Sequence, residues 1–500
     1  MDETAAPTPT TVAVFGLPFH NVTFSETVEW ARRRVASGQP GYIATVNMDF
    51  VAQAWRDPEF QRILFNADLV VADGIPIVWL SGLLGPRLKE RVTGSDLVPM
   101  LAEMARDNNF SLFHLGGAPG VAEKAADALT RRFPGLRMAG CYSPPYAGVL
   151  DMDHAGILAR LETAKPDLLL IAFGAPKQEK FANMHVHHWH VPVSIGIGGS
   201  LDFLAGAQKR APKIVQQLAM EWFWRMLSDP PRLFRRYVGN LTLFFQAMLQ
   251  LTLIRCRPDR AVPPLAPAPE LVRAAHVEAF VRFSDAAQAA AFGSALQARA
   301  AGRPIVLDMS GVPWVSSLEL GALLLLTTQL HQRQQPCILA GVGLRIRRLL
   351  AWSRLSEYLE LGNSPGEILD QIQEWAACPP NGSVQYDTAG RLVLQLPREL
   401  TEANVVAFQQ QVAAAPAREG TREWLVEASF TRHVDSAALG CLLALQKQAA
   451  ARGIALRFTG VRPAVHQALR NAKLAAVLLT PETTNGDMPP TVGAPTTEPR

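Results

Sequence analysis

The stretch Gly196–Tyr237, GIGGSLDFLAGAQKRAPKIVQQLAMEWFWRMLSDPPRLFRRY, decides how the first half of the chain is interpreted. Its beginning is an apolar run that breaks into glycines, as a buried strand does where it meets a ligand. The spacing after Pro212 predicts a helix rich in tryptophan, which Pro230 and Pro231 end. Guanidinium groups beside this helix could bind phosphates in forked geometry. They belong to Arg225, Arg232, Arg235 and Arg236. The alternative is an amphipathic helical hairpin whose arginines are only solvated.

Length and composition limit the class of protein. At roughly 100–200 residues per domain, a chain of 500 residues suggests about three or four domains. The hydrophobic fraction of 48% indicates a globular chain, and a net charge of +4 is too small to indicate a nucleic-acid partner. The five cysteines are scattered, which favours a reducing compartment over a disulfide framework or a zinc motif. The N-terminus MDETAAPTPTT lacks the features of a signal peptide.

Short apolar runs alternate with helical patterns from Thr11 to about Ala219. The strand candidates are Val12–Phe15, Gly41–Val46, Leu69–Ala72, Ser111–Leu115, Leu168–Phe173 and Val193–Ile197. The helical patterns between them include Thr27–Ala36, Gly120–Arg132 and Asp153–Thr163. Continuous apolar strands separated by helices predict an α/β fold, a Rossmann-like and mostly parallel sheet covered on both faces.

Polar or glycine-rich segments follow five of these strands. They are Thr45-Val46-Asn47, Asp73-Gly74, Gly116-Gly117, Gly174–Glu179 and Gly198-Gly199-Ser200. Ligands of open α/β sheets bind beyond the carboxyl ends of the strands. The domain is therefore predicted to be an enzyme with its site at this edge.

Each candidate residue also has a structural interpretation. Asp73 is either a general base at the ligand crevice or a turn residue. Asn47 can position substrate together with Thr45 on one side of an extended strand end, or it can cap a helix. Gln178 can line the pocket or fill the first turn of a helix. Gly116-Gly117 is a candidate phosphate-binding loop without the dinucleotide fingerprint.

Two patterns suggest metal sites that we do not expect. Asp151 and Asp153 have the acidic spacing of metal-dependent glycosyltransferases, but they open a helix, so capping is the favoured interpretation. A dense histidine run has no carboxylate or cysteine close to it in sequence. It comprises His185, His187, His188 and His190. No metal and no cofactor is predicted.

An uncharged apolar segment, Tyr237–Ile254, follows the arginines. It just reaches the lower length of a membrane span, but Asn240, Gln246 and Gln250 would be costly in lipid. A helix lying in the membrane interface is favoured, because basic residues flank it on both sides. A helix packed on the protein and a true span remain as alternatives.

The chain repeats itself beyond a proline-rich linker. PIVLDMSGVPWVSSLELGALLLL from Pro304 resembles WLVEASFTRHVDSAALGCLLAL from Trp424, and several landmarks keep one constant offset. These landmarks include the pairs Ser317 with Ser436 and Gly321 with Gly440. A fixed offset indicates two copies of one module, each a strand, a helix that begins at a serine, and a further strand. That serine is either a helix cap or a phosphorylation point.

Residues from about Val12 to Tyr237 resemble the WecG/TagA/CpsF family of bacterial glycosyltransferases. The matching stretches are TVN at Thr45–Asn47, ADG at Ala72–Gly74, RVTGSDL at Arg91–Leu97, FGAPKQE at Phe173–Glu179, and the ending GGSLDFLAGAQKRAP…EW…R…PRLFRRY. The resemblance implies transfer of an N-acetylmannosamine-type sugar, or its uronic acid, from a UDP donor to undecaprenyl-pyrophosphate-linked N-acetylglucosamine. It further implies inversion at the sugar carbon without a metal.

The same resemblance implies roles for individual residues. Asp73 would deprotonate the acceptor hydroxyl, with Thr45, Asn47 and Gln178 in the same pocket. Arg225, Arg232 and Arg235 would come from a C-terminal appendage that stabilises the departing UDP. Substrate contacts are expected at Gly116, Gly117, Gly174, Lys177, Gly198 and Gly199. Docking on the bilayer would fold the appendage over the pocket.

The two C-terminal copies resemble STAS domains, in which an Asp-Ser pair opens the signalling helix and the serine is phosphorylated. The second copy keeps this pair as Asp435-Ser436. The first copy has Ser316-Ser317 instead, with Glu319 where a glycine is usual. The copies are therefore expected to regulate, to bind a protein partner or to self-associate.

These inferences predict a peripheral enzyme on the cytoplasmic face of the bacterial inner membrane. The alternative is a non-catalytic scaffold that senses a sugar nucleotide and signals through its STAS domains. A nucleotide-sugar epimerase or dehydrogenase is a weaker alternative, because such an enzyme requires a dinucleotide-binding fingerprint that this sequence lacks. The predicted segments are a tail (1–10), the transferase domain (11–220), the appendage (221–257), a linker (258–270), the first STAS domain (271–378), a linker (379–388), the second STAS domain (389–480) and a tail (481–500).

Overall fold

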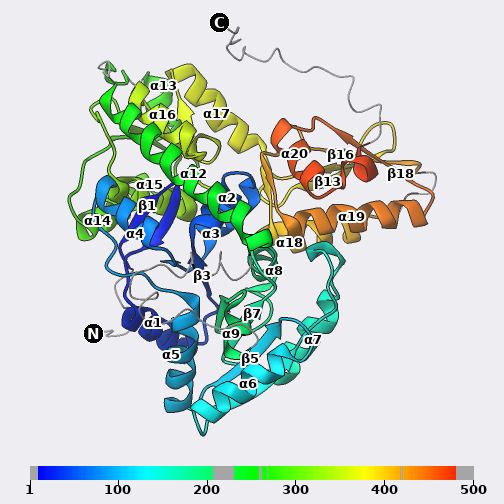
Figure 1. Cartoon of the computed structure of the whole chain (residues 1–500). Coiled ribbons are helices and arrows are strands. Elements are labelled where there is room, and N and C mark those ends of the chain that lie inside the picture. Colours follow the sequence, from blue (N-terminus) through cyan, green and yellow to red (C-terminus); the bar gives the residue numbers. More distant parts are fainter. Residues whose placement is uncertain are drawn as a thin grey trace, which may run out of the picture. The chain divides into compact units, whose positions relative to one another are not determined.

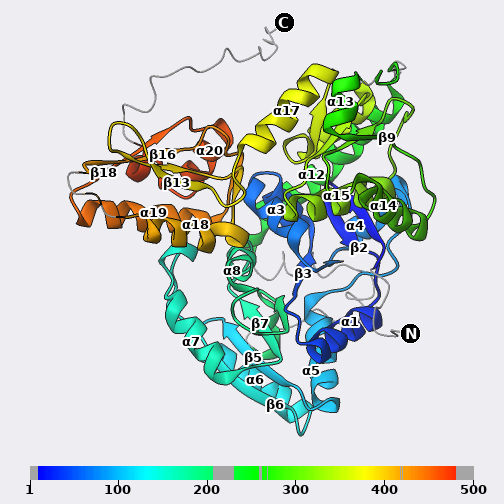
Figure 2. The same cartoon turned by 180° about the vertical axis from the view of Figure 1, so that it is seen from behind.

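The computed structural model describes residues 9–206, 224, 230–257, 262–266, 268–416, 418 and 421–479. The chain divides into two compact units, Met1–Trp375 and Ala376–Arg500 (Figures 1 and 2). The predicted C-terminal tail, nearly all of the N-terminal tail and most of the tryptophan-rich helix after Pro212 lie outside the described residues. The first unit contains the predicted transferase domain together with the first repeated module.

The central sheet of the first unit has six parallel strands in the order β4-β3-β8-β7-β5-β6. They are β3 (Tyr42–Val46), β4 (Leu69–Ala72), β5 (Ser111–Gly116), β6 (Arg137–Tyr142), β7 (Leu168–Ala172) and β8 (Val193–Gly196). The predicted parallel α/β fold is confirmed. Because all six strands run the same way, all their carboxyl ends lie at one edge of the sheet.

Both faces of this sheet are buried at β4 and β7, which explains why these two strands are continuously apolar. Leu168 and Leu170 of β7 join a core with helices on one face, whereas Leu169 and Ile171 join a second core on the other. The first face is covered by α1 (Phe24–Ser37), α5 (Gly94–Asp107) and α6 (Val121–Arg132). The second is covered by α2 (Met48–Ala54), α3 (Pro58–Asn66), α7 (His154–Ala164) and α8 (Lys177–His185).

The first predicted strand does not join the sheet, and this corrects the sequence-based prediction. β1 (Thr11–Val14) instead pairs antiparallel with β2 (Leu17–His20) in a separate hairpin. The two-residue turn consists of Phe15 and Gly16, with φ of 55° and 78°. Positive φ at both positions matches the twist of a tight hairpin, so the chain folds back before it can reach the sheet.

The uncharged segment lies within one long helix, α12 (Pro230–Cys256). Ala247, Leu251 and Ile254 on one side are buried, and α12 packs against α2 and against α16 (Leu344–Trp352). Apolar side chains on another side are exposed: Phe234, Val238, Leu241, Phe245, Leu249 and Leu253. None of the helices that the structure describes is both long and apolar enough to span a bilayer.

The first repeated module has a four-stranded parallel sheet in the order β12-β11-β10-β9. Its strands are β9 (His276–Ala279), β10 (Ile305–Asp308), β11 (Cys337–Ala340) and β12 (Glu360–Gly362). Its helices are α13 (Pro269–Ala274), α14 (Ala286–Ala300), α15 (Ser317–Gln332), α16, the 3-10 turn η2 (Leu355–Glu357) and α17 (Pro365–Ala377).

Local contacts explain two features of this module. Glu319 forms a capping box with Ser316 at the start of α15 and an ion pair with Arg282, 3.0 Å away. The residue that departs from the usual STAS pattern therefore stabilises the helix start. Described residues of the predicted linker belong to the fold, because the Leu265 amide donates to Asp308 and α13 begins at Pro269.

The second unit repeats this plan. Its main sheet has the order β13-β14-β16-β18, with β13 antiparallel to β14 and the other pairs parallel. These strands are β13 (Ser383–Tyr386), β14 (Leu392–Gln395), β16 (Glu423–Glu427) and β18 (Ala455–Thr459), and the pair β15 (Glu399–Leu400) and β17 (His433–Val434) lies apart. The helices are α18 (Glu402–Ala414), α19 (Ser436–Ala451), α20 (Pro463–Asn471) and α21 (Ala475–Leu478). Asp435 caps α19 by accepting from the Ala438 amide at 2.9 Å.

Candidate active site

The exits of β3 and β4 are joined at the carboxyl edge of the sheet. The Asp73 amide, directly after β4, donates to the Val46 carbonyl at 2.8 Å. Gly74 then begins α4 (Ile75–Leu84), and a Cβ at Gly74 would lie 4.0 Å from the Cα of Asn47. Asp73 is therefore positioned at the start of a helix, beside Asn47, and is partly exposed. A half-exposed carboxylate at a strand end can reach a ligand.

Asn47 performs the capping role that was its structural alternative. Its Oδ1 accepts from the amides of Asp49 and Phe50 at 2.9 and 3.3 Å and so fixes the start of α2. The side-chain nitrogen takes no part in this cap. Asn47 can therefore cap α2 and still present a donor at the carboxyl edge of the sheet.

Thr45 lies where the exits of β3 and β8 meet the start of α5. Its hydroxyl donates to the carbonyl of Gly196 at 3.3 Å, which connects β3 with β8. A Cβ at Gly94 would lie 3.5 Å from both the Thr45 hydroxyl and the Ser200 hydroxyl. The segments that carry Thr45, Gly94 and Ser200 are thus neighbours, although Gly94 and Ser200 were not among the predicted site residues.

Gln178 holds two glycine loops together. Its Oε1 accepts from the amides of Gly174 and Gly198 at 3.1 and 3.2 Å, and its side chain is almost fully buried. Its Nε2 donates to Glu179 at 2.7 Å. Gln178 therefore fixes the exits of β7 and β8 relative to each other.

Glu179 is a buried carboxyl behind these loops that sequence reasoning had not assigned a role. It accepts from Gln178 and from the Tyr42 hydroxyl, 3.2 Å away. Burial raises the pKa of Glu179 from 4.5 to about 7, although these hydrogen bonds oppose the shift. A Cβ at Gly196 would lie 2.5 Å from Gln178 and from Tyr42, so only glycine fits there.

This carboxyl should make stability depend on pH. In the unfolded chain Glu179 ionises near 4.5, and in the folded chain near 7. Its contribution to the free energy of unfolding is therefore complete below the unfolded pKa and is lost as the pH rises through the folded pKa of about 7. At 1.36 kcal/mol per pKa unit, this contribution amounts to about 3 kcal/mol. We expect Glu179→Gln to remove this slope. Thermal melting at pH 5 and pH 7.5 measures it; parallel profiles for the variant and wild type would contradict the prediction.

The remaining predicted contacts are distributed around the same edge. The Gly117 amide donates to the Ala172 carbonyl at 3.0 Å, so in this structure it points into the protein rather than toward an anion. Lys177, at the start of α8, lies over the rings of Tyr146 and Phe173 at 5.0 and 5.2 Å. Burial lowers the pKa of this lysine. Gly199, next to Ser200 at the start of α9 (Ser200–Leu204), is exposed.

The predicted arginines are only partly described. Arg225 lies outside the described residues, and Arg232 and Arg235 belong to the first turns of α12 without a description of their side chains. Their distance from Asp73 therefore stays a prediction.

One member of the acidic pair, Asp153, and one of the histidine run, His185, have structural roles. Asp153 caps α7 by accepting from the Gly156 amide at 2.9 Å, as the capping interpretation predicts. His185 pairs with His154 at 2.7 Å, and burial lowers the pKa of His185 to about 3. Within the described residues, no group of three histidine, cysteine, aspartate or glutamate side chains could hold a metal ion.

The parallel sheet with polar side chains beyond its strand ends defines an α/β protein of the class that binds ligands at this edge, and comparison with known proteins specifies the family. The model of the "Glycosyl transferase WecG/TagA/CpsF family" matches residues 12–257. STAS-domain models match residues 283–368 and 384–480. The chain belongs to the WecG/TagA/CpsF family of glycosyltransferases and carries two C-terminal STAS domains.

Two relatives illustrate the similarity. The N-acetylglucosaminyldiphosphoundecaprenol N-acetyl-beta-D-mannosaminyltransferase of Staphylococcus aureus strain MRSA252 is 32% identical over 45% of this chain and 87% of its own length. The enzyme of the same name from Bacillus spizizenii is 32% identical over 38% of this chain and 72% of its own. The solved anion transporter SLC26A9 matches 32% of each chain at 14% identity with a TM-score of 0.17, which supports no structural comparison.

Proposed function

We propose that this chain transfers an N-acetylmannosamine-type sugar, or its uronic acid, from a UDP donor to undecaprenyl-pyrophosphate-linked N-acetylglucosamine. The observation that carries the proposal is the convergence of Thr45, Asn47, Asp73 and Gln178 at one sheet edge. The names of the relatives supply the sugar and the acceptor. The product would enter a cell-surface polysaccharide.

The chemistry is a single displacement. The Asp73 carboxylate takes the proton of the acceptor hydroxyl, and the oxygen attacks the sugar carbon while its bond to UDP breaks. Negative charge then develops on the departing diphosphate. Arg225, Arg232 and Arg235 would stabilise that charge, so the mechanism requires no metal. One attack from the face opposite the leaving group inverts the sugar carbon.

The stereochemistry of the product tests this mechanism. We expect the anomeric configuration of the new bond, measured by NMR of the product, to be opposite to that of the donor. Retention would indicate a covalent intermediate, and it would contradict a mechanism in which Asp73 acts only as a base.

An exposed apolar face supports work at a membrane surface. Phe245, Leu249 and Leu253 of α12 are exposed, as are Trp79 and Leu83 of α4. The two helices meet where Arg255 donates to the Leu83 carbonyl at 3.2 Å. We propose that this face lies on the cytoplasmic leaflet of the inner membrane, where the lipid-linked acceptor is held.

A pair of matched variants tests this face. Phe245→Glu with Leu249→Glu should weaken binding to anionic vesicles by more than about tenfold, because apolar side chains lose their insertion into the bilayer. Gln246→Glu with Gln250→Glu adds the same charge at neighbouring exposed positions of α12. Vesicle co-sedimentation measures both. An equal loss in the two pairs would show that charge alone, and not apolar contact, governs binding.

A further inference from the structure

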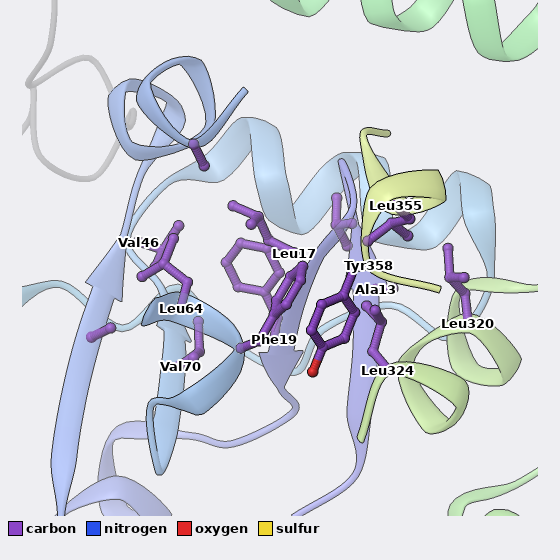
Figure 3. Close-up of a cluster of buried hydrophobic side chains, with 14 of the residues drawn as sticks. Ala13, Leu17, Phe19, Val46, Leu64, Val70, Leu320, Leu324, Leu355 and Tyr358 are labelled. Carbon is purple, nitrogen blue, oxygen red and sulfur yellow. The ribbon is translucent and has the colours of Figure 1, made fainter. Parts of the chain in front are cut away.

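The first STAS domain shares a hydrophobic core with the transferase domain. Figure 3 shows Leu320 and Leu324 of α15 beside Ala13 of the N-terminal hairpin, with Tyr358 beside Phe19. Helix α15 approaches β1 so closely that a Cβ at Gly321 would lie 2.5 Å from the Thr11 carbonyl oxygen. The hairpin of β1 and β2, which is separate from the central sheet, is therefore covered by this STAS domain.

A second contact is made by the corner between α16 and η2. The Ser353 carbonyl accepts from the buried Gln61 side chain of α3 at 3.1 Å. The turn glycine Gly16 packs on the same residue, since a Cβ there would lie 2.4 Å from the Ser353 oxygen. The rings of Trp55 and Trp352 meet edge to face at 5.0 Å. This polar and aromatic contact fixes the orientation of the two domains.

The serine at the start of α15 is closed in by the transferase domain. Ser317 is 3% exposed, and its hydroxyl has no hydrogen-bond partner among the described residues. A Cβ at Gly85, directly after α4, would lie 2.3 Å from that hydroxyl. The cavity beside it measures about 20 Å³, room for roughly one water molecule. A charged group attached to Ser317 could not remain in this contact.

The contact touches both helices that the candidate site depends on. Helix α4 begins beside Asp73 and ends at Gly85 against Ser317. Helix α12, whose first turns carry Arg232 and Arg235, packs on α16 of the STAS domain and on α2, which begins at Asn47. A shift of the STAS domain would therefore be transmitted to helices that begin beside Asp73 and Asn47.

We propose that the first STAS domain is a built-in subunit of the transferase, docked by the serine-bearing start of α15 on β1 and on the end of α4. Its partner is thus the transferase domain of the same chain, and the docked position holds α4 and α12 in place for catalysis. The effect on catalysis rests on the proposed function, whereas the docking does not.

Hydrogen exchange followed by mass spectrometry on the full chain tests the docking. Ser317→Asp places a charge in a closed apolar contact and should accelerate exchange in residues 11–20 and 317–332 by at least about tenfold. Ser317→Ala and the matched Ser436→Asp of the second STAS domain should leave residues 11–20 as in wild type. Wild-type protection of residues 11–20 in Ser317→Asp would overturn the proposal.

A second pair of variants covers the case in which Ser317→Asp unfolds the whole unit, seen as lost protection in β7. Gly321→Ala should accelerate hydrogen exchange in the hairpin, residues 11–20, whereas Gly440→Ala, at the same position of α19, should not. Equal protection of residues 11–20 in the two variants would overturn the docking. Transfer measured on the same samples separates the claims. Faster exchange with unchanged transfer overturns the catalytic coupling, and a wild type without any transfer refutes the proposed function but leaves the docking result standing.

Discussion

Asp73→Asn should lower the rate of sugar transfer by about 10²–10⁴-fold, because the amide cannot take the proton of the acceptor hydroxyl. The substitution keeps the size of the side chain, and the backbone bond from residue 73 to Val46 is unaffected. Donor binding should therefore persist. Initial rates at saturating donor and acceptor, with donor affinity from calorimetry, measure the two quantities separately.

The matched control is Asp153→Asn. Asp153 belongs to the acidic pair that resembles a metal-binding motif, but it caps α7 through the Gly156 amide. Asparagine caps helices as well as aspartate does, so the fold and the transfer rate should both be retained. A large loss in Asp153→Asn with normal rates in Asp73→Asn would reverse the two assignments.

Replacing either Arg232 or Arg235 by alanine should lower kcat by about 10²–10³-fold, the cost of removing charge stabilisation at a developing anion. The two residues are three positions apart in the first turns of α12, so they lie on one side of the helix. Lysine should restore only part of the rate, because it lacks the forked donors of a guanidinium group. Single-turnover rates with prebound donor measure the chemical step.

Arg257→Ala provides the control for this pair. Arg257 follows the other end of α12, and its side chain is exposed. Its replacement by alanine removes one positive charge, as each of the other two substitutions does. Its rate should remain close to that of wild type. If all three arginine variants lose transfer equally, the effect comes from membrane attraction and not from the departing diphosphate.

The central sheet was predictable because a strand that is buried on both faces is a continuous run of apolar residues in the sequence. Leu69–Ala72 and Leu168–Ala172 are short, continuous apolar runs, followed by Asp73-Gly74 and by Phe173-Gly174. The hairpin was not predicted. Its strands are as apolar as those of the sheet, and only the positive φ of Phe15 and Gly16 turns the chain back. Phenylalanine rarely adopts positive φ, so the sequence did not indicate a turn at this position.

The placement of polar side chains at the sheet edge was predictable where residues end or follow strands, and contacts between distant residues were missed. Asp73, Thr45 and Gln178 could be found from local pattern. The bond between Tyr42 and Glu179 joins residues far apart in the chain, and each looks locally like an ordinary strand or helix residue. Glu179 lies in the polar run Lys177–Lys180, which gives no local signal of a buried carboxyl.

The docking of the first STAS domain did leave a signal in the sequence. The part Leu320–Leu326 of its helix SLELGALLLLTTQLHQ is apolar on all sides and is followed by two threonines, whereas the matching helix SAALGCLLALQKQAAA carries Gln446 and Lys447 there. A helix that is apolar all round must be buried all round. Thr327 and Thr328, which replace those polar residues, are both buried in the first unit.

The most direct test is the release of UDP by the wild-type full-length chain, supplied with UDP-N-acetylmannosamine, its uronic acid or UDP-N-acetylglucosamine. Vesicles with and without lipid-pyrophosphate-linked N-acetylglucosamine would provide the surface. We predict that a mannosamine-type donor releases UDP only when the lipid acceptor is present. Donor binding without UDP release across the whole panel, by folded and vesicle-bound protein, would contradict the account and favour a sensing scaffold.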